Sequence, residues 1–387
     1  MSPIKKVILF CHRWLGLISG LVVFIVSITG CIFCFQDEIQ DAMYSYRHVN
    51  TKGEYLQPSR LVANVKKQYP KGSPDYIYYY GVNRPAGVLT NMGKDGFEYV
   101  FLNPYTGEIT HHEKPQTNFF IIVEYIHLYL LLPPAIGKWV VGVSVIIFMV
   151  IMITGLILWW PKRKSDRKRS FTIKWGGRWL RVNYDLHNVL GFYATSIALI
   201  LAITGLAIAF EPVSKAIYKV ANLGTNVKNE VVEPKSDSLK RAGVSDKPVI
   251  DIAFSYARKH APDAQMFLIH NDPSVAGAIG VGAYAKSMHY SHANGWEFDK
   301  YNGKLLKAYI YDKKSPGLKL TEMNYDIHVG QILGLPGKII AFLVSLICAS
   351  LPVTGFIIWL GKRKKPRGKK VKVAVHRKTH KKQLAAV

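Results

Sequence analysis

Cysteines are rare in this chain of 387 residues: only four occur, and each lies in or beside a long apolar run (Cys11, Cys31, Cys34 and Cys348). The hydrophilic segments therefore have no disulfide framework of the kind that stabilises many small secreted domains. Cys31 and Cys34 have the spacing of a redox motif, but they lie in an apolar helix without the strand–helix context of such motifs, and we expect them to pack rather than react. No Cys-x-x-Cys-His sequence occurs, which excludes the covalent attachment of a c-type haem.

Acidic residues are also few, with 25 against 51 basic residues and a net charge of +26. A surplus of this size is typical of nucleic-acid-binding proteins. Its distribution argues against nucleic acid, because segments 1–13, 162–186 and 362–387 hold three, nine and twelve basic residues with only two acidic ones among them. Each of these segments adjoins a long apolar run. The positive-inside rule then predicts that all three lie in the cytoplasm, where they contact anionic membrane lipid.

Four apolar stretches are long enough to cross a bilayer, which takes about 20 helical residues. No small-residue cleavage pattern follows the first stretch before Gln36, so it is interpreted as an uncleaved anchor rather than a secretion signal. We therefore predict a membrane protein of four transmembrane α-helices with both termini in the cytoplasm. The spans are expected near 14–36, 138–160, 188–211 and 338–361. The predicted segments, in chain order, are a first span with a cytoplasmic N-terminus (1–36), an outside domain (37–125), an interfacial segment and second span (126–161), a basic cytoplasmic loop (162–186), a third span (187–211), a second outside domain (212–327), an interfacial segment and fourth span (328–361), and a basic cytoplasmic tail (362–387).

The two halves of the chain repeat each other at the first and third spans. His12 opens the first span and His187 opens the third, and each is followed four residues later by glycine. A Thr-Gly pair, Thr29-Gly30 or Thr204-Gly205, begins 17 residues after each histidine. The sequence thus predicts that one helix design, with a histidine at its start, has been used twice.

The second and fourth spans repeat in the same way. Lys138 and Lys338 each precede a Thr-Gly pair by 16 residues, and each span ends in tryptophan and a Lys-Arg-Lys run. These pairs are Thr154-Gly155 and Thr354-Gly355. A second set of histidines lies upstream, in the matching dipeptides Ile126-His127 and Ile327-His328.

Each outside segment has the pattern of a small α+β unit. An amphipathic helical stretch is followed by strand-like runs and then by a turn that an Asn or Asp opens and a Gly closes. The expected helices are 58–69 and 249–260, the expected strands are 76–82, 97–102, 265–269, 277–284 and 296–298, and the expected turns are 103–107 and 299–303. This order, once in each half, resembles the PepSY domain.

With these features the chain resembles the PepSY-associated transmembrane proteins, and among them the bacterial inner-membrane siderophore–iron reductases, which carry two b-type haems. The residues that carry the resemblance are His12-Arg-Trp-Leu-Gly16, the four Thr-Gly pairs, Ile157-Leu-Trp-Trp-Pro161, His187-x-x-x-Gly191 and the two turns. The resemblance covers nearly the whole chain except the tail. It implies two haem b cofactors and a ferric siderophore as substrate, although the family also includes members without an assigned function.

The four histidines are the expected axial ligands of the haem iron. A single histidine at a helix end is ordinarily just a hydrogen-bonded interfacial residue, but ionisable groups at membrane depth are costly and tend to be functional. Topology pairs His12 with His187 at the cytoplasmic face and His127 with His328 at the outer face. Mixed pairs would have to bridge most of a core about 30 Å thick. Prolines separate His127 and His328 from the following spans, so each is expected on a short interfacial helix with its ring turned into the bundle.

Glycines and arginines near these histidines complete the expected sites. Gly30 and Gly205 are expected near the outer haem and Gly155 and Gly355 near the inner one, where small residues allow a planar group, or simply another helix, to approach closely. The haem propionates are expected to contact Arg13, Arg178 and Arg181, unless these arginines serve only as positive-inside anchors.

Two aspartates lie close in sequence to the expected histidine ligands and are candidates for orienting their rings. Asp185 and Asp326 each lie two residues before a histidine, His187 or His328, and could orient its ring nitrogen. Residues two apart on a helix do not share a face, which weakens this interpretation.

The leading functional hypothesis is a transmembrane electron wire that reduces a ferric siderophore outside and releases ferrous iron. The cytoplasmic segments are short and carry no flavin or nicotinamide fingerprint, so the electron donor is expected to be a cytoplasmic reductase or a membrane quinol. The rival hypothesis is a haem-free membrane regulator or transport accessory whose outside domains bind peptides or a protease.

Overall fold

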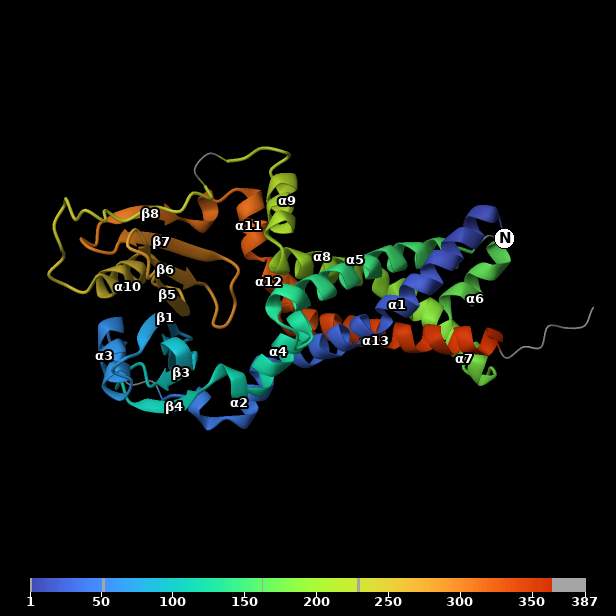
Figure 1. Ribbon diagram of the computed structural model, residues 1–387, viewed down its shortest axis with the longest axis horizontal. Coiled ribbons are helices and arrows are strands. Elements are labelled where there is room, and N and C mark those ends of the chain that lie inside the picture. Colours follow the sequence, from blue (N-terminus) through green and yellow to red (C-terminus); the bar gives the residue numbers. More distant parts are fainter. Residues whose placement is uncertain (1, 51–52, 162, 228–229, 364–387) are drawn as a thin grey trace, which may run out of the picture.

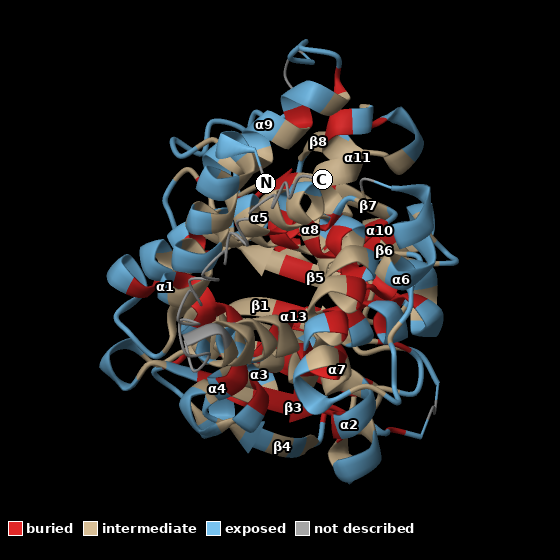
Figure 2. Ribbon diagram, turned by 90° about the vertical axis from the view of Figure 1, so that its right-hand side faces the viewer, coloured by how far each residue is buried: buried red, intermediate tan, exposed pale blue. Residues whose placement is uncertain are grey.

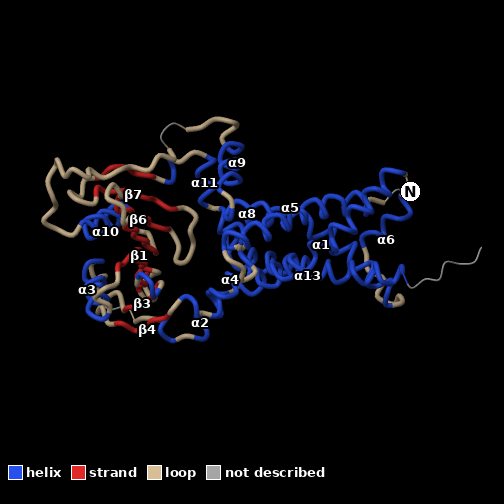
Figure 3. Tube along the Cα trace, in the orientation of Figure 1, coloured by secondary structure: helices blue, strands red, loops and turns tan. Residues whose placement is uncertain are grey.

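The computed structural model describes residues 2–50, 53–161, 163–227 and 230–363. These residues form an elongated molecule with a helix bundle at one end and a β-sheet domain at the other (Figure 1). All strands lie in the sheet domain, and the two parts are joined by short helices (Figure 3). Most of the predicted basic tail, from residue 364 onward, lies outside the described residues.

The bundle consists of four long apolar helices, each long enough to cross a membrane. They are α1 (Pro3–Cys34), α5 (Pro134–Trp159), α7 (Trp179–Asp185) continued through a π-helical turn (Leu186–Leu190) into α8 (Gly191–Ala209), and α13 (Gly334–Arg363). Their outward faces expose large apolar side chains, such as Ile18, Leu21 and Ile146, which are 71%, 70% and 53% exposed. Apolar surface on this scale requires a lipid solvent, so the protein is a multi-pass membrane protein.

Short helices occupy both ends of the bundle. The end near the N-terminus carries α6 (Arg167–Phe171) beside α7, whereas the opposite end carries the helices that lead to the sheet. The latter are α2 (Gln36–Met43), α4 (Phe119–Tyr129), α9 (Glu211–Ala221), α11 (Pro316–Glu322) and α12 (Asn324–His328). A proline at the first or second position starts α9 and α11, where the missing N–H has no helical partner to lose.

One antiparallel sheet of eight strands forms the other end, in the order β4-β3-β2-β1-β5-β6-β7-β8. The first half of the chain supplies β1 (Ser73–Tyr79), β2 (Ala86–Asn91), β3 (Phe97–Leu102) and β4 (Ile109–Glu113). The second half supplies β5 (Met266–Asn271), β6 (Ala278–Tyr284), β7 (Ala293–Asp299) and β8 (Leu305–Tyr309). The halves meet where β1 pairs with β5 over the register Tyr76↔His270 to Tyr79↔Phe267.

The sheet has a single hydrophobic core on the face that α3 (Pro58–Gln68) and α10 (Val249–His260) cover. Leu61 and Phe254 from these helices are fully buried against strand residues from both halves, including Tyr79 and Phe298. Figure 2, viewed from the N-terminal end of the bundle, shows buried residues concentrated along the strands and between the long helices. The expectation of a separate domain in each half is therefore wrong: the two segments share one sheet and one core, because β1 and β5 pair with each other.

The predicted helices and turns of the outside segments are present, but the strands are only partly as expected. The turns close on Gly107 and Gly303, whose φ angles of +76° and +72° favour glycine, and Asn103 and Asp299 accept backbone hydrogen bonds within them. Strand β3 has its predicted bounds, whereas β2, β4 and β8 were not predicted. In these three short strands apolar and polar residues alternate only weakly. Their strand conformation therefore depends on pairing with neighbouring strands and not on the local sequence pattern.

Candidate functional site

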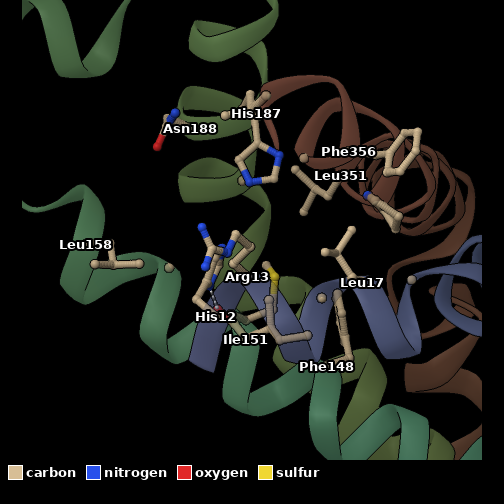
Figure 4. A pocket seen from close by; sticks show the side chains of 18 of the residues that line it. His12, Arg13, Leu17, Phe148, Ile151, Leu158, His187, Asn188, Leu351 and Phe356 are labelled. Carbon is tan, nitrogen blue, oxygen red and sulfur yellow. Dashed lines mark hydrogen bonds between the residues drawn. The ribbon is translucent and has the colours of Figure 1, made fainter. Parts of the chain in front are cut away.

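The inner pair of histidines, His12 and His187, lies at the end of the bundle remote from the sheet. His12 projects from α1, and His187 lies in the π-helical turn between α7 and α8. Their ring centroids are 6.4 Å apart and their planes are nearly perpendicular, at 87°. Figure 4 shows the two side chains reaching toward each other across a cavity. π-Helical turns are rare and occur often at functional sites.

The outer pair, His127 and His328, lies at the sheet end of the bundle. His127 is on α4 and His328 ends α12, and their ring centroids are 6.1 Å apart at an interplanar angle of 65°. Both are on short helices outside the long spans, with their rings turned into the bundle. The structure thus brings together the two pairs that the topology predicted.

All four histidines are held through the same ring nitrogen. In each case Nδ1 contacts the hydroxyl oxygen of a Thr-Gly threonine on another helix, at 2.9–3.1 Å, in the pairs His12–Thr154, His127–Thr29, His187–Thr354 and His328–Thr204. In the first two pairs Nδ1 also contacts a backbone carbonyl, that of Ile151 at 3.1 Å or Val26 at 2.9 Å. A carbonyl only accepts hydrogen bonds, so Nδ1 carries the proton in His12 and His127.

The threonine hydroxyls complete this assignment for the other two histidines. Every one of the four donates its own proton to a carbonyl four residues earlier in its helix, at 2.8–2.9 Å. The oxygen therefore accepts from Nδ1–H of the histidine. In the neutral imidazole this leaves Nε2 unprotonated, and no hydrogen bond among the described residues occupies it. A neutral imidazole fixed in this tautomer presents Nε2 as a metal ligand.

The glycines of the Thr-Gly pairs make room for the histidine rings. A Cβ atom added at Gly30, Gly155 or Gly355 would lie 3.2–3.3 Å from Cε1 of His127, His12 or His187, and one added at Gly205 would lie 2.9 Å from Cε1 of His328. Each Thr-Gly pair is thus a seat for one histidine, in which threonine holds Nδ1 and glycine admits the ring. Sequence reasoning placed the glycines at the correct ends of the bundle but missed the threonines, although their constant spacing from the histidines was a visible signal.

Replacing Gly205 with alanine is expected to destabilise the protein by about 1–3 kcal/mol, because the added methyl overpacks the seat of His328. Gly361 on α13 is a matched control, since a Cβ there would meet only ordinary contacts at 3.5 Å or more. Thermal unfolding in detergent measures both variants. Equal midpoints for Gly205→Ala and Gly361→Ala would show that the seat tolerates a side chain.

A cavity of about 680 Å³ separates the inner histidines. Besides His12 and His187 it is lined by apolar and aromatic residues, including Trp159 and Trp359, and by the seat glycines Gly155 and Gly355. Its volume is within the range of about 300–1,000 Å³ found for ligand and cofactor sites. Small residues where the helices meet and a largely apolar wall suit a planar hydrophobic group.

Of the three arginines predicted to contact propionates, only Arg13 lines the inner cavity, where it lies beside His12 (Figure 4). Arg181 instead forms an ion pair with the buried Asp185 at 2.8 Å. Arg178 is exposed at the N-cap of α7. Arg13 reaches the cavity from α1, whereas Arg181 and Asp185 are one helical turn apart and pair with each other.

Neither of the two aspartates contacts a histidine ring among the hydrogen bonds of the described residues. Asp185 accepts hydrogen bonds from Arg181 and from the backbone N–H of Lys174. Asp326 accepts hydrogen bonds from the backbone N–H groups of Tyr290 and Ser291, at 3.2 and 2.8 Å. Asp326 thus fastens the loop between β6 and β7 to the helix that carries His328.

Several tyrosines lie on the face of the sheet that is turned toward the bundle. Tyr79 and Trp296 are buried in the core under α3 and α10, but the alternation of the strands places Tyr76, Tyr78 and Tyr284 on the opposite face. Figure 1 shows α3 and α10 on the side of the sheet away from the bundle, so this opposite face looks toward it. Burial raises the pKa of Tyr284 to about 12, so its phenol is harder to ionise than that of an ordinary tyrosine.

An aromatic contact connects this face to the outer histidines. The ring of Tyr290, in the loop fastened by Asp326, lies 5.8 Å from that of Tyr284 and 5.4 Å from that of Tyr325. Tyr325 precedes His328 by three residues on α12. The tyrosine face is therefore linked through packed rings to the helix of an outer-pair histidine.

The sequence matches the family of the PepSY-associated TM region over residues 9–362. The chain belongs to this family. The matched range contains both histidine pairs, all four Thr-Gly seats and the whole sheet. No curated protein matches the sequence of this PepSY-associated protein.

Proposed function

We propose that this PepSY-associated protein is a di-haem electron-transfer protein, with one haem b between His12 and His187 and another between His127 and His328. The observation that supports this most directly is the separation of the rings, 6.4 Å and 6.1 Å between centroids. A bond from a metal to an imidazole nitrogen is about 2 Å long and the ring centre lies roughly 1 Å further, so two imidazoles on opposite sides of one metal have centroids about 6 Å apart. Both pairs fit this separation.

The donor set favours haem over a bare metal ion. Each site offers two neutral imidazoles, and the described residues contain no group of three or more His, Cys, Asp or Glu side chains that could hold a metal. Haem needs only two ligands from the protein, because its macrocycle supplies the other four. Haem iron held by two histidines supplies one-electron transfer, because no coordination position remains open. Arg13 would pair with a propionate at the inner site.

The chain's own residues fix this chemistry in place. The threonine seats hold each imidazole in one tautomer and one orientation, and most of the wall of the inner cavity is apolar. Such fixed surroundings would limit how far the protein must rearrange when the charge of the haem iron changes. The two sites lie at opposite ends of the bundle, so one would lie near each face of the membrane.

The proposed reaction is the reduction of a ferric siderophore, one electron per iron, by a haem-dependent reductase of the bacterial inner membrane. The positive-inside rule supports cytoplasmic termini and hence an extracytoplasmic sheet. A cytoplasmic reductase or a membrane quinol would deliver electrons at the inner site. The neutral tyrosine face, linked to His328 through Tyr290 and Tyr325, supports docking of the ferric chelate above the outer site. The ferrous ion is held less tightly by hard oxygen donors and is released.

A duplication of one helix–sheet–helix unit accounts for this arrangement in our proposal. Each half of the chain contributes one long helix, then a short helix and four strands, then a second long helix. Each half also contributes one histidine to each pair. The two histidines of each site would then be equivalent residues of the two units.

The rival proposal is a haem-free regulator or transport accessory that binds peptides or a protease. Strands β4 and β8 are the two edges of the described sheet, and an edge strand can pair with an extended peptide. This proposal gives no role to four histidines held in one tautomer.

The absorption spectrum distinguishes the two proposals. Protein purified after expression with haem available is expected to contain two haems per chain and to show the sharp reduced band of a bis-histidine cytochrome after dithionite. A variant with all four histidines changed to alanine is the control for adventitious haem. A colourless wild type, or a variant that binds as much haem, would contradict the assignment and favour the rival.

A further inference from the structure

Two buried asparagines occupy equivalent places behind the histidine seats. Asn183 and Asn324 each lie four residues, about one helical turn, before His187 and His328. They are only 1% and 8% exposed. Each side-chain amide donates to the backbone carbonyl of a seat threonine, Asn183 to Thr354 and Asn324 to Thr204, both at 3.0 Å.

At each site, two hydrogen bonds therefore join the helix that carries the histidine to the helix that carries the seat threonine. At the inner site the histidine and asparagine are on one helix, and both bind Thr354 on α13, through its hydroxyl and its carbonyl. At the outer site Asn324 and His328 on α12 bind Thr204 on α8 in the same manner. Two bonds about one turn apart prevent the histidine helix from rotating or sliding against its seat, which a single bond allows.

Stability alone does not account for the amide of Asn183. A buried polar atom without a partner loses its hydration without compensation, and no hydrogen bond from the described residues reaches the buried Oδ1 of Asn183. The orientation cannot be reversed to remove this cost, because the carbonyl of Thr354 only accepts hydrogen bonds and must face Nδ2. The side chain is thus kept at a place where an apolar residue would avoid the penalty.

Only one histidine of each pair has this support. The residues four positions before His12 and His127 are Ile8 and Val123, which have no polar side chain. Each proposed haem would therefore have one ligand whose helix is tied to the seat by an asparagine and one ligand whose helix lacks such an asparagine. At the inner site the tied histidine lies in the π-helical turn, where one backbone bond of the regular helix is missing and outside support has most effect.

We propose that Asn183 and Asn324 are positioning residues, which fix the orientation of the imidazoles of His187 and His328 and so tune the haems they bind. This inference rests on the proposed haem ligation. The angle between the two ligand planes and the basicity of each imidazole set the electronic state of a bis-histidine haem, and both depend on how firmly the ring is held.

The test compares Asn183→Leu and Asn324→Leu, which keep the side-chain volume, with Ile8→Ala and Val123→Ala at the equivalent positions of the other ligands. Haem content, the low-spin electron paramagnetic resonance signals and the midpoint potentials of the two haems are measured in the full-length protein. Asn324→Leu is expected to shift the g-values and potential of the outer haem only, and Asn183→Leu those of the inner haem only. The two control variants are expected to leave both signals at their wild-type positions.

Each outcome decides the proposal. Selective loss of the haem at the altered site, with the other haem intact, supports it as strongly as a shifted signal. Wild-type signals at both haems in the two asparagine variants would overturn the positioning role while leaving the haem proposal standing. Equal disturbance of both haems by one substitution would overturn it too, since that indicates a general loosening of the bundle. A wild type without haem overturns the proposed ligation itself, and is distinguished by the absence of any haem signal before the asparagines are changed.

Discussion

Changing His187 to alanine is expected to leave one haem per chain instead of two, with the loss confined to the inner site. The imidazole of His187 faces that of His12 across the cavity, and no other histidine of the described structure takes part in this pair. His12→Ala should give the same result, whereas His127→Ala and His328→Ala should remove the outer haem and keep the inner one. The haem-to-protein ratio, together with the two midpoint potentials, reports which site is lost.

A matched control comes from histidines of the sheet domain. His260 lies on the surface of α10 and stacks on Tyr256, far from both pairs, and His260→Ala should keep both haems. The ligand assignment is wrong if all four single variants retain two haems. The pairing of the ligands is wrong if His12→Ala removes the same haem as His328→Ala and not the same haem as His187→Ala.

The second large effect concerns the reaction with iron. His328→Ala is expected to abolish rapid reoxidation of the dithionite-reduced protein by a ferric siderophore, while dithionite still reduces the inner haem at the wild-type rate. The reason is distance: the 17 residues from His12 to Thr29, the seat of His127, span about 25 Å at 1.5 Å per residue. Without the outer haem an electron would have to cross this whole span in one step.

Stopped-flow absorption of the two proteins measures this difference directly. His187→Ala is the informative comparison, because its outer haem should still be oxidised rapidly by the chelate once reduced. Reoxidation of His328→Ala at the wild-type rate would place the chelate at the inner site. If no ferric chelate reoxidises the wild type, the haem wire stands and iron reduction is not its purpose.

The two sets of experiments separate ligation from reaction. In the proposal, haem stoichiometry depends on the histidines, their seats and the two supporting asparagines, whereas reoxidation also depends on the tyrosine face and the loop that carries Tyr290. Asp326 connects these parts, since it holds the loop to the helix of His328. The route from the sheet to the outer histidine is thus built from residues of the second half of the chain.

Local sequence determined much of this protein. The four spans follow from the length of the apolar runs, because a bilayer of fixed thickness requires about 20 apolar residues of any composition. The pairing of His12 with His187 and of His127 with His328 follows from the alternating direction of those spans. The helices of the sheet domain and the turns at Gly107 and Gly303 were also predictable, since periodicity and turn chemistry are properties of adjacent residues.

Only the tertiary structure decided the rest, because each of these features depends on which segments meet. The pairing of β1 with β5 merges two expected domains into one sheet, and its register places Tyr79 in the core and Tyr78 on the opposite face. Arg181 is paired with Asp185 and is not available to the cavity, whereas Arg13 lines it. The spacing of the Thr-Gly pairs was plain in the sequence. Only the packed helices show that threonine binds Nδ1, that glycine leaves room for the ring and that asparagine ties two helices together. A hydrogen bond between residues so far apart in the sequence leaves no local pattern to detect.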